Sequence, residues 1–168
     1  GANNGGGDSS SAASSLKNNV TDIYSTNFAF AALKDDGSVV TWGHNVYGGD
    51  NSSIVFPNKG VKQIFANRYA FAALMNDSSV ITWGSPELGG DSSSVESEIQ
   101  SGVINIASTN AAFAALKDDG SVLTWGDPNE GGNSDSVSLS LSSGVTEIHS
   151  TGSSFAALKS DGSVVSWG

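Results

Sequence analysis

The sequence lacks cysteine and contains few basic residues. Its 168 residues include no Cys and 7 Lys or Arg, against 17 Asp or Glu, so the net charge is −10. Without cysteine, disulfide scaffolds, thiolate zinc sites and cysteine nucleophiles are excluded. The few basic side chains are too scattered to neutralise several phosphates, so we expect no binding to nucleic acid or to anionic membrane surfaces. Because no apolar run approaches the roughly 18 residues of a spanning helix, we also expect no membrane insertion.

The rest of the composition favours a folded domain with an uncharged polar surface. Charged residues make up 14% of the chain and hydrophobic residues 38%, including 4 Trp and 7 Phe. A disordered acidic segment is usually richer in charge and poorer in apolar side chains. With serine and glycine abundant, we interpret this surface as typical of an extracellular or cell-surface protein.

An internal repeat dominates the sequence. Trp-Gly pairs begin at Trp42, Trp83, Trp125 and Trp167, with spacings of 41, 42 and 42 residues. Relative to FAALKDDGSVVTWG at 30–43, the corresponding segments of the later units are identical at 10, 13 and 12 of 14 positions. The sequence therefore forms a single repeat array over 1–168, which divides into the repeats 1–43, 44–84, 85–126 and 127–168.

Each unit carries the pattern of three short strands. The first is a V-x-x-I segment rich in β-branched residues, the second an F-A-A-L run, and the third an S-V-V-T-W run. Asp-Gly joins the second and third strands in three units, which is a strong hairpin signal because Gly accepts positive φ. The second unit has Asn76-Asp77-Ser78 instead, so we expect a less favourable turn there. No segment has a sustained apolar period of 3.6, so little or no helix is expected.

These patterns predict an all-β fold of propeller blades. We expect four tandem units of about 42 residues, each a three-to-four-stranded antiparallel sheet, packed face to face. The array would be an open arc or part of a larger ring or array. The alternative is a β-solenoid, which normally has shorter rungs and no hairpin turn within each rung.

The aromatic residues at fixed repeat positions are interpreted as structural. We expect the Trp and Phe side chains to pack between blades, with each indole N–H bonded to a backbone carbonyl. The alternative is that the four Trp line a carbohydrate or peptide groove. The residues concerned are Trp42, Trp83, Trp125, Trp167, Phe30, Phe71, Phe113 and Phe155.

The polar residues give no catalytic constellation. His44 and His149 have no histidine partner at metal-ligand spacing, and the carboxylates recur from unit to unit, whereas catalysis needs one unusual environment. We therefore predict a protein that is not an enzyme and has no cofactor. Asp8, Asp50 and Asp91, which follow Gly-Gly pairs, are weak candidates for calcium ligands, and a plain turn is the simpler interpretation.

Two further sets of surface residues are candidates for function. The loops after the Trp-Gly pairs differ between units at one equivalent place, so Tyr47, Glu87, Leu88 and Glu130 are candidate contacts for a partner. Three N-x-S/T sequons predict N-glycosylation at Asn19, Asn51 and Asn76 if the protein is secreted by a eukaryote.

The unit resembles the repeat of the regulator-of-chromosome-condensation superfamily. In that family D-G-x-V-x-x-W-G closes a blade, and residues 36–43 of this chain match it. Ser-Gly-Val-Thr-Glu-Ile at 143–148 is similar to the short bacterial repeats of the propeller-type beta-lactamase inhibitor protein. The resemblance implies a propeller, but the family's loop Gln is replaced here by Gly-Asp. The family usually has seven blades, so four units imply a part of a larger assembly, made by a continuing chain or by joined copies.

The resulting functional hypothesis is a non-enzymatic structural or interaction repeat module. We expect it to associate edge to edge with further copies of the same repeat, in a ring or a filament, because uncapped near-identical units suit assembly. The alternative is a closed-propeller module, resembling an inhibitor or a lectin, that binds a protein or glycan ligand through its variable inter-blade loops.

Overall fold

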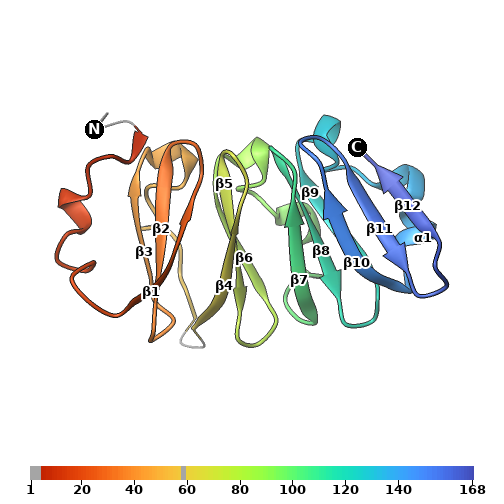
Figure 1. Cartoon of the computed structure of the whole chain (residues 1–168), viewed down its shortest axis with the longest axis horizontal. Coiled ribbons are helices and arrows are strands. Elements are labelled where there is room, and N and C mark those ends of the chain that lie inside the picture. Colours follow the sequence, from red (N-terminus) through yellow and green to blue (C-terminus); the bar gives the residue numbers. More distant parts are fainter. Residues whose placement is uncertain (1–4, 58–59) are drawn as a thin grey trace.

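The computed structural model describes residues 5–57 and 60–168, which form four separate three-stranded sheets (Figure 1). Each sheet belongs to one repeat, so the all-β prediction is confirmed and each blade has three strands. The strands are β1 (Val20–Ser25), β2 (Ala29–Lys34), β3 (Val39–Gly43), β4 (Val61–Ala66), β5 (Ala70–Met75), β6 (Val80–Gly84), β7 (Val103–Ser108), β8 (Ala112–Lys117), β9 (Val122–Gly126), β10 (Val145–Ser150), β11 (Phe155–Lys159) and β12 (Val164–Trp167).

The helical content of the described residues is small, as the sequence predicts. It consists of the single-turn helix α1 (Ser138–Leu141) and short 3₁₀ turns in the segments that precede or follow the blades. These turns are η2 (Ser10–Ala12), η3 (Asn45–Tyr47), η4 (Pro86–Leu88), η5 (Ser93–Val95), η6 (Pro128–Glu130) and η7 (Asp135–Val137). No helix in the described ranges is both long and apolar enough to cross a membrane.

Each blade is a simple antiparallel meander. In blade one, β2 lies between β1 and β3, and Phe30 is directly opposite Trp42. Their rings stack with centroids 5.2 Å apart, and the same pair recurs in the other blades at 5.1, 5.5 and 5.3 Å. Because such cross-strand pairs fix register, one local pattern specifies the same blade four times.

The hairpin between the second and third strands is closed by an aspartate. In blade one, Asp36 Oδ1 accepts hydrogen bonds from the amide and the hydroxyl of Ser38, and Gly37 has a φ of 79°. Blade two places Ser78 at the glycine position with a φ of 67°, a region that L residues rarely adopt. The unfavourable turn expected in the second unit is therefore located at Ser78.

The blades stand side by side along the long axis of the molecule and form an open arc (Figure 1). The first strands of adjacent blades contact one another, as β1 contacts β4 and β4 contacts β7. The connecting segments lie against the third strands, where the amide of Val80 bonds to the carbonyl of Ile99. Three-stranded sheets linked in this way are blades, so the solenoid alternative is wrong.

Every blade has two different faces. In blade two, Ile64, Phe71 and Trp83 point to one side, which we call the Trp face. Ala72 and Leu74 point to the other side, which we call the Ala face. The Trp face of each following blade packs on the Ala face of the blade before it, so three of the four hydrophobic clusters are joints between blades.

Candidate functional site

The joints between blades bring the repeated alanines and aromatic residues together. In the joint between blades two and three, Ala72 and Leu74 pack with Ile106, Phe113 and Trp125, and all five side chains are buried. Alanine leaves room for the neighbouring blade to approach, and the large rings of that blade fill the space. The Phe and Trp side chains that the sequence assigns to structure lie in these joints, apart from those of blade one.

The indole nitrogens of all four tryptophans are hydrogen-bonded in the same way. Each Nε1 donates to the carbonyl of the first glycine of a Gly-Gly pair, at distances of 3.0 to 3.2 Å. Glycine is also required at this position by the neighbouring ring, because a Cβ on Gly48 would lie 2.5 Å from Phe71. Together with the burial of the rings, this leaves no face of Trp83 or Trp125 for a sugar or peptide.

The aspartates of the Gly-Gly-Asp segments serve as turn residues. Asp8, Asp50 and Asp91 each accept a hydrogen bond at Oδ1 from the amide two residues later. This amide lowers the pKa of Asp8 and of Asp50 from the usual 3.8. The described residues contain no group of three or more His, Cys, Asp or Glu side chains that could hold a metal ion.

The Trp face of blade one is partly covered by the N-terminal segment. Ala12 and Leu16 pack against Ala32 and Trp42, and the carbonyl of Gly6 accepts the Trp42 indole bond. The segment covers this face only in part, since Ile23 remains 62% exposed. The equivalent isoleucines of the other blades are 1%, 4% and 9% exposed. An apolar position that is buried in three joints is therefore open on blade one.

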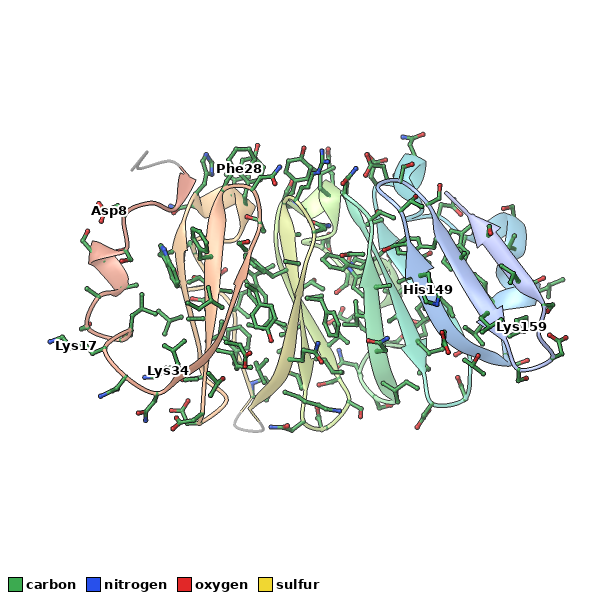
Figure 2. All side chains as sticks on the ribbon, viewed as in Figure 1. Asp8, Lys17, Phe28, Lys34, His149 and Lys159 are labelled. Carbon is green, nitrogen blue, oxygen red and sulfur yellow. The ribbon has the colours of Figure 1, made fainter. Side chains whose placement is uncertain are left out.

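The Ala face of blade four is uncovered at the other end of the array. Val164 is 63% exposed, whereas the equivalent Val80 and Val122 are 3% and 7% exposed. A shallow hollow on this face is lined by residues that include His149, Ser154 and Ala156. Figure 2 shows His149 on β10 of this last blade. The open ends of the array thus present one Trp face and one Ala face.

Each joint is also fastened by two backbone hydrogen bonds, one at each end of the blades. At one end, the amide of Asn27 donates to the carbonyl of Arg68 at 3.0 Å. At the other end, the amide of Val61 donates to the carbonyl of Gly37 at 2.9 Å. Both bonds recur in the next two joints. The two blades approach so closely at the second bond that a Cβ on Gly37 would lie 2.7 Å from Gly60.

The loops predicted to contact a partner lie along one edge of the arc. We call this edge the upper rim and define it by the turns 26–28, 67–69, 109–111 and 151–153 together with η3, η4 and η6. In each of the first three blades, a side chain of the turn bonds to the carbonyl that ends the 3₁₀ turn. The carbonyls are those of Tyr47, Leu88 and Glu130, and the bonds measure 3.2, 2.7 and 2.9 Å.

Part of the upper rim is an aromatic cluster. Tyr47 lies 4.7 Å from Phe28, 4.7 Å from His44 and 5.7 Å from Tyr69, measured between ring centroids. We call these four residues the aromatic platform; all are half-buried. Figure 2 shows Phe28 at this edge of blade one. The Nδ1 atom of His44 is buried and has no hydrogen-bond partner among the described residues.

The remaining predicted loop residues do not join the aromatic platform. Glu87 is exposed, and Leu88 and Glu130 are half-buried on the rim of the later blades. Sequence reasoning selected Tyr47 but missed Phe28 and Tyr69. The available signal was an aromatic residue in units one and two at the position of Ala111 and Ser153 in the other units.

The three sequon asparagines have different surroundings. Asn19 is exposed, with a φ of 65°, and Asn76 is exposed in the blade-two hairpin. Asn51 is half-buried, and its Nδ2 donates to the carbonyl of Val39 at 3.4 Å. A glycan on Asn51 would have to displace this bond, so Asn51 is the least accessible of the three acceptors. Glycosylation at all three remains a prediction.

No protein-family model and no curated protein matches the chain. Among solved structures, it is similar to yeast RCC1 (Prp20), seen in complex with Kap60, with a TM-score of 0.63 and 22% identity over 89% of this chain and 43% of that one. The four units have the fold of RCC1-like propeller repeats. A second similar structure is the CRINKLY WD40 ectodomain of the Arabidopsis thaliana receptor kinase ACR4, with a TM-score of 0.58, 18% identity and coverage of 90% and 51%.

Human WBSCR16 is similar to the same extent, with a TM-score of 0.58, 18% identity and coverage of 91% and 48%. The chain therefore spans about half or less of each of these proteins. At such low identity the likeness concerns the fold, so it confirms the predicted RCC1-like propeller. The closer resemblance to the short bacterial inhibitor repeats stays a prediction.

Proposed function

We propose that this chain is a non-enzymatic interaction module of an extracellular or cell-surface protein, and that it self-associates through its two end blades. The observation that supports the proposal is the exposure of Ile23 at one end and Val164 at the other, at positions that are buried or half-buried in the joints. Leaving such apolar area in water is unfavourable, so covering it drives association.

The two exposed faces favour an arrangement that continues the array. A Trp face and an Ala face are different surfaces, so contact between them is heterologous, and it yields a ring if the rotation closes or a filament if it does not. The repeated hairpin aspartates and the turn aspartates engage neighbouring amides and hydroxyls, as described above, which supports a structural role for them. The polar, weakly charged surface supports an extracellular location.

The first test is the mass of the whole chain in solution as a function of concentration, by sedimentation velocity and negative-stain electron microscopy. We expect the mean mass to rise with concentration, with rings or fibres in the micrographs. Because the contact is apolar, added salt should not dissociate the assembly. A single monomeric species over the full accessible concentration range would overturn the proposal.

A second candidate function is the binding of a protein partner through the aromatic platform. The fold does not require these rings, since the positions of Tyr47 and His44 are occupied by Glu130 and Asp127 after blade three, and that of Phe28 by Ala111 in blade three itself. Tyrosine-rich patches are typical of binding hot spots. The sole arginine, Arg68, is exposed beside Tyr69 in the sequence.

The platform is tested by the double substitution Tyr47→Ala and Tyr69→Ala, with the exposed neighbour substitution Val46→Ala as the matched control. Proteins captured from the extracellular fraction of the source organism are compared quantitatively by mass spectrometry. A partner of the platform is retained by Val46→Ala and lost by the double variant. Retention of every captured protein by the double variant would remove this candidate. If the double variant instead loses the ability to bind neutral glycans, the platform is a lectin-like site.

A further inference from the structure

We infer that the Trp face of blade one docks on the Ala face of blade four of a second copy of this chain, and reproduces the internal blade joint. The inference rests on the proposed self-association and specifies its geometry. The partner is a second copy of the chain, and the two faces that meet are unlike. Contacts between like faces, such as Trp face to Trp face, are therefore excluded.

The apolar positions of the two open faces match those of the internal joints. Ile23 occupies the place that Ile64, Ile106 and Ile148 fill in the three joints, and Leu158 occupies the place of Leu33, Leu74 and Leu116. In each internal joint the isoleucine and the leucine are buried together. In the single chain, Ile23 is 62% exposed and Leu158 is half-buried. Docking a second copy places both side chains in the surroundings that their counterparts already have.

The backbone amides and carbonyls that form hydrogen bonds between adjacent blades have counterparts on the two end blades. By equivalence, the amide of Gly152 on one copy faces the carbonyl of Asn27 on the next, and the amide of Val20 faces the carbonyl of Gly162. The contact surface at the hairpin is open in the single chain. A Cβ added to Gly162 would meet no heavy atom within 4 Å, whereas at Gly37 and Gly120 it would meet the next blade at 2.7 Å.

Three polar residues on the blade-four face weaken the docked joint relative to the internal ones. His149 replaces Tyr24, Phe65 and Ala107, which pack in the internal joints. Ser154 replaces an alanine and Ser166 a threonine. His149 Nε2 lies 3.1 Å from Glu147 Oε2, and both side chains are largely exposed. Docking must therefore dehydrate polar groups, so the contact between copies is reversible while the array itself stays folded.

The pairing is tested by two single variants, each of which disrupts one of the two apolar faces. Ile23→Asp places a charge on the Trp face of blade one, and Leu158→Asp places one on the Ala face of blade four. Both positions are accessible in the single chain, so folding should be preserved, which circular dichroism checks. Leu139→Asp is the control, because Leu139 is 90% exposed outside both faces. Sedimentation velocity measures the mass of each variant alone and of the two mixed.

The expected result is specific to a contact between unlike faces. Each of the two face variants alone should be monomeric, and the control should assemble as the unmodified chain does. An equal mixture of the two face variants should form a dimer and no larger assembly. The dimer forms because one variant keeps an intact Ala face and the other an intact Trp face. If the unmodified chain assembles but the mixture stays monomeric, the pairing is wrong while the proposed self-association stands. If the unmodified chain never assembles, both fail.

A crosslink gives an independent readout, since the chain has no cysteine of its own. In an internal joint, the hydroxyl of Ser108 donates to the carbonyl of Ala66 at 3.0 Å, and the equivalent pair between copies is Ser25 with Ser150. Oxidation of the double variant Ser25→Cys, Ser150→Cys should give covalent multimers. Covalent dimers from Ser25→Cys alone at the same yield would overturn the pairing, because they need two like faces. Ala66→Cys with Ser108→Cys is the intrachain control.

Discussion

At the scale of single residues, the strain of each hairpin turn depends on whether glycine or serine occupies its left-handed position. Gly37, Gly120 and Gly162 have φ values of 79°, 77° and 84°, and Ser78 has 67° at the same position. A side chain in the left-handed region is strained, because its Cβ approaches the following carbonyl. The carbonyl of Ser78 still accepts the joint bond from the amide of Val103. The second unit thus keeps the geometry of the turn with a less suitable residue.

Replacing Ser78 with glycine should therefore stabilise the protein. We expect an increase of about 1 kcal/mol in the free energy of unfolding, because the strain of the left-handed conformation is relieved. Urea unfolding followed by tryptophan fluorescence measures the change. The reverse substitution Gly162→Ser in blade four is the matched control, because a Cβ there would meet no heavy atom within 4 Å, and it should lower stability by a similar amount. Stabilisation by both substitutions would contradict the explanation.

At the scale of the element, each hairpin is closed by a carboxylate that accepts two hydrogen bonds from one serine. This arrangement is found at Asp36, Asp77, Asp119 and Asp161, where the hydroxyl of the serine two residues later lies 2.6 Å from Oδ1. The serine hydroxyl, followed by its amide, lowers the pKa of Asp36, Asp119 and Asp161 below the usual 3.8. The hairpins are therefore most stable when the aspartates are ionised.

Acid should weaken the hairpins in a defined pH range. Because the folded pKa lies below the unfolded value of 3.8, the added stability is present above that pH and is lost as the pH falls through the folded pKa. We expect the urea midpoint to be insensitive to these groups between about pH 7 and 5 and to fall below about pH 4. Asp119→Asn keeps an acceptor but does not titrate, so it should reduce the fall. An unchanged acid profile would contradict this cause.

At the scale of the whole molecule, stability depends on how many neighbours a blade has. In repeat arrays, stability is approximately a sum of unit terms and nearest-neighbour joints. Blades two and three are covered on both faces, whereas blade one has only the N-terminal segment on its Trp face and blade four has an open Ala face. The end blades are therefore the parts with the weakest packing, and they are also the surfaces proposed for assembly.

Equivalent tryptophans should consequently differ in their contribution to stability. Trp83→Ala removes a ring that is 3% exposed in a joint, and we expect a loss of about 3–5 kcal/mol. Trp42→Ala removes a ring that is 9% exposed beneath the N-terminal segment, so the loss should be smaller. Denaturant unfolding at a concentration where the chain is monomeric measures both. Equal losses would show that the preceding blade adds nothing to the packing of the ring.

The sequence by itself determined the blades and their hairpins, because these depend on local features. The alternation in F-A-A-L and S-V-V-T-W sets which side chains share a face, and Asp-Gly sets the turn. Four copies of one pattern also made the face-to-face stacking predictable, since each blade must bury both apolar faces. The turn aspartates followed from the same local chemistry, because an Asx turn needs only the amide two residues later.

Only the tertiary structure decided which surfaces are left for function. Phe28, His44, Tyr47 and Tyr69 come from loops that are distant in the sequence and meet only because adjacent blades align their turns along one rim. In the same way, Ile23 and Ile64 have similar sequence surroundings, yet one is open and the other buried. The difference comes from the presence or absence of a preceding blade, which a local pattern does not encode.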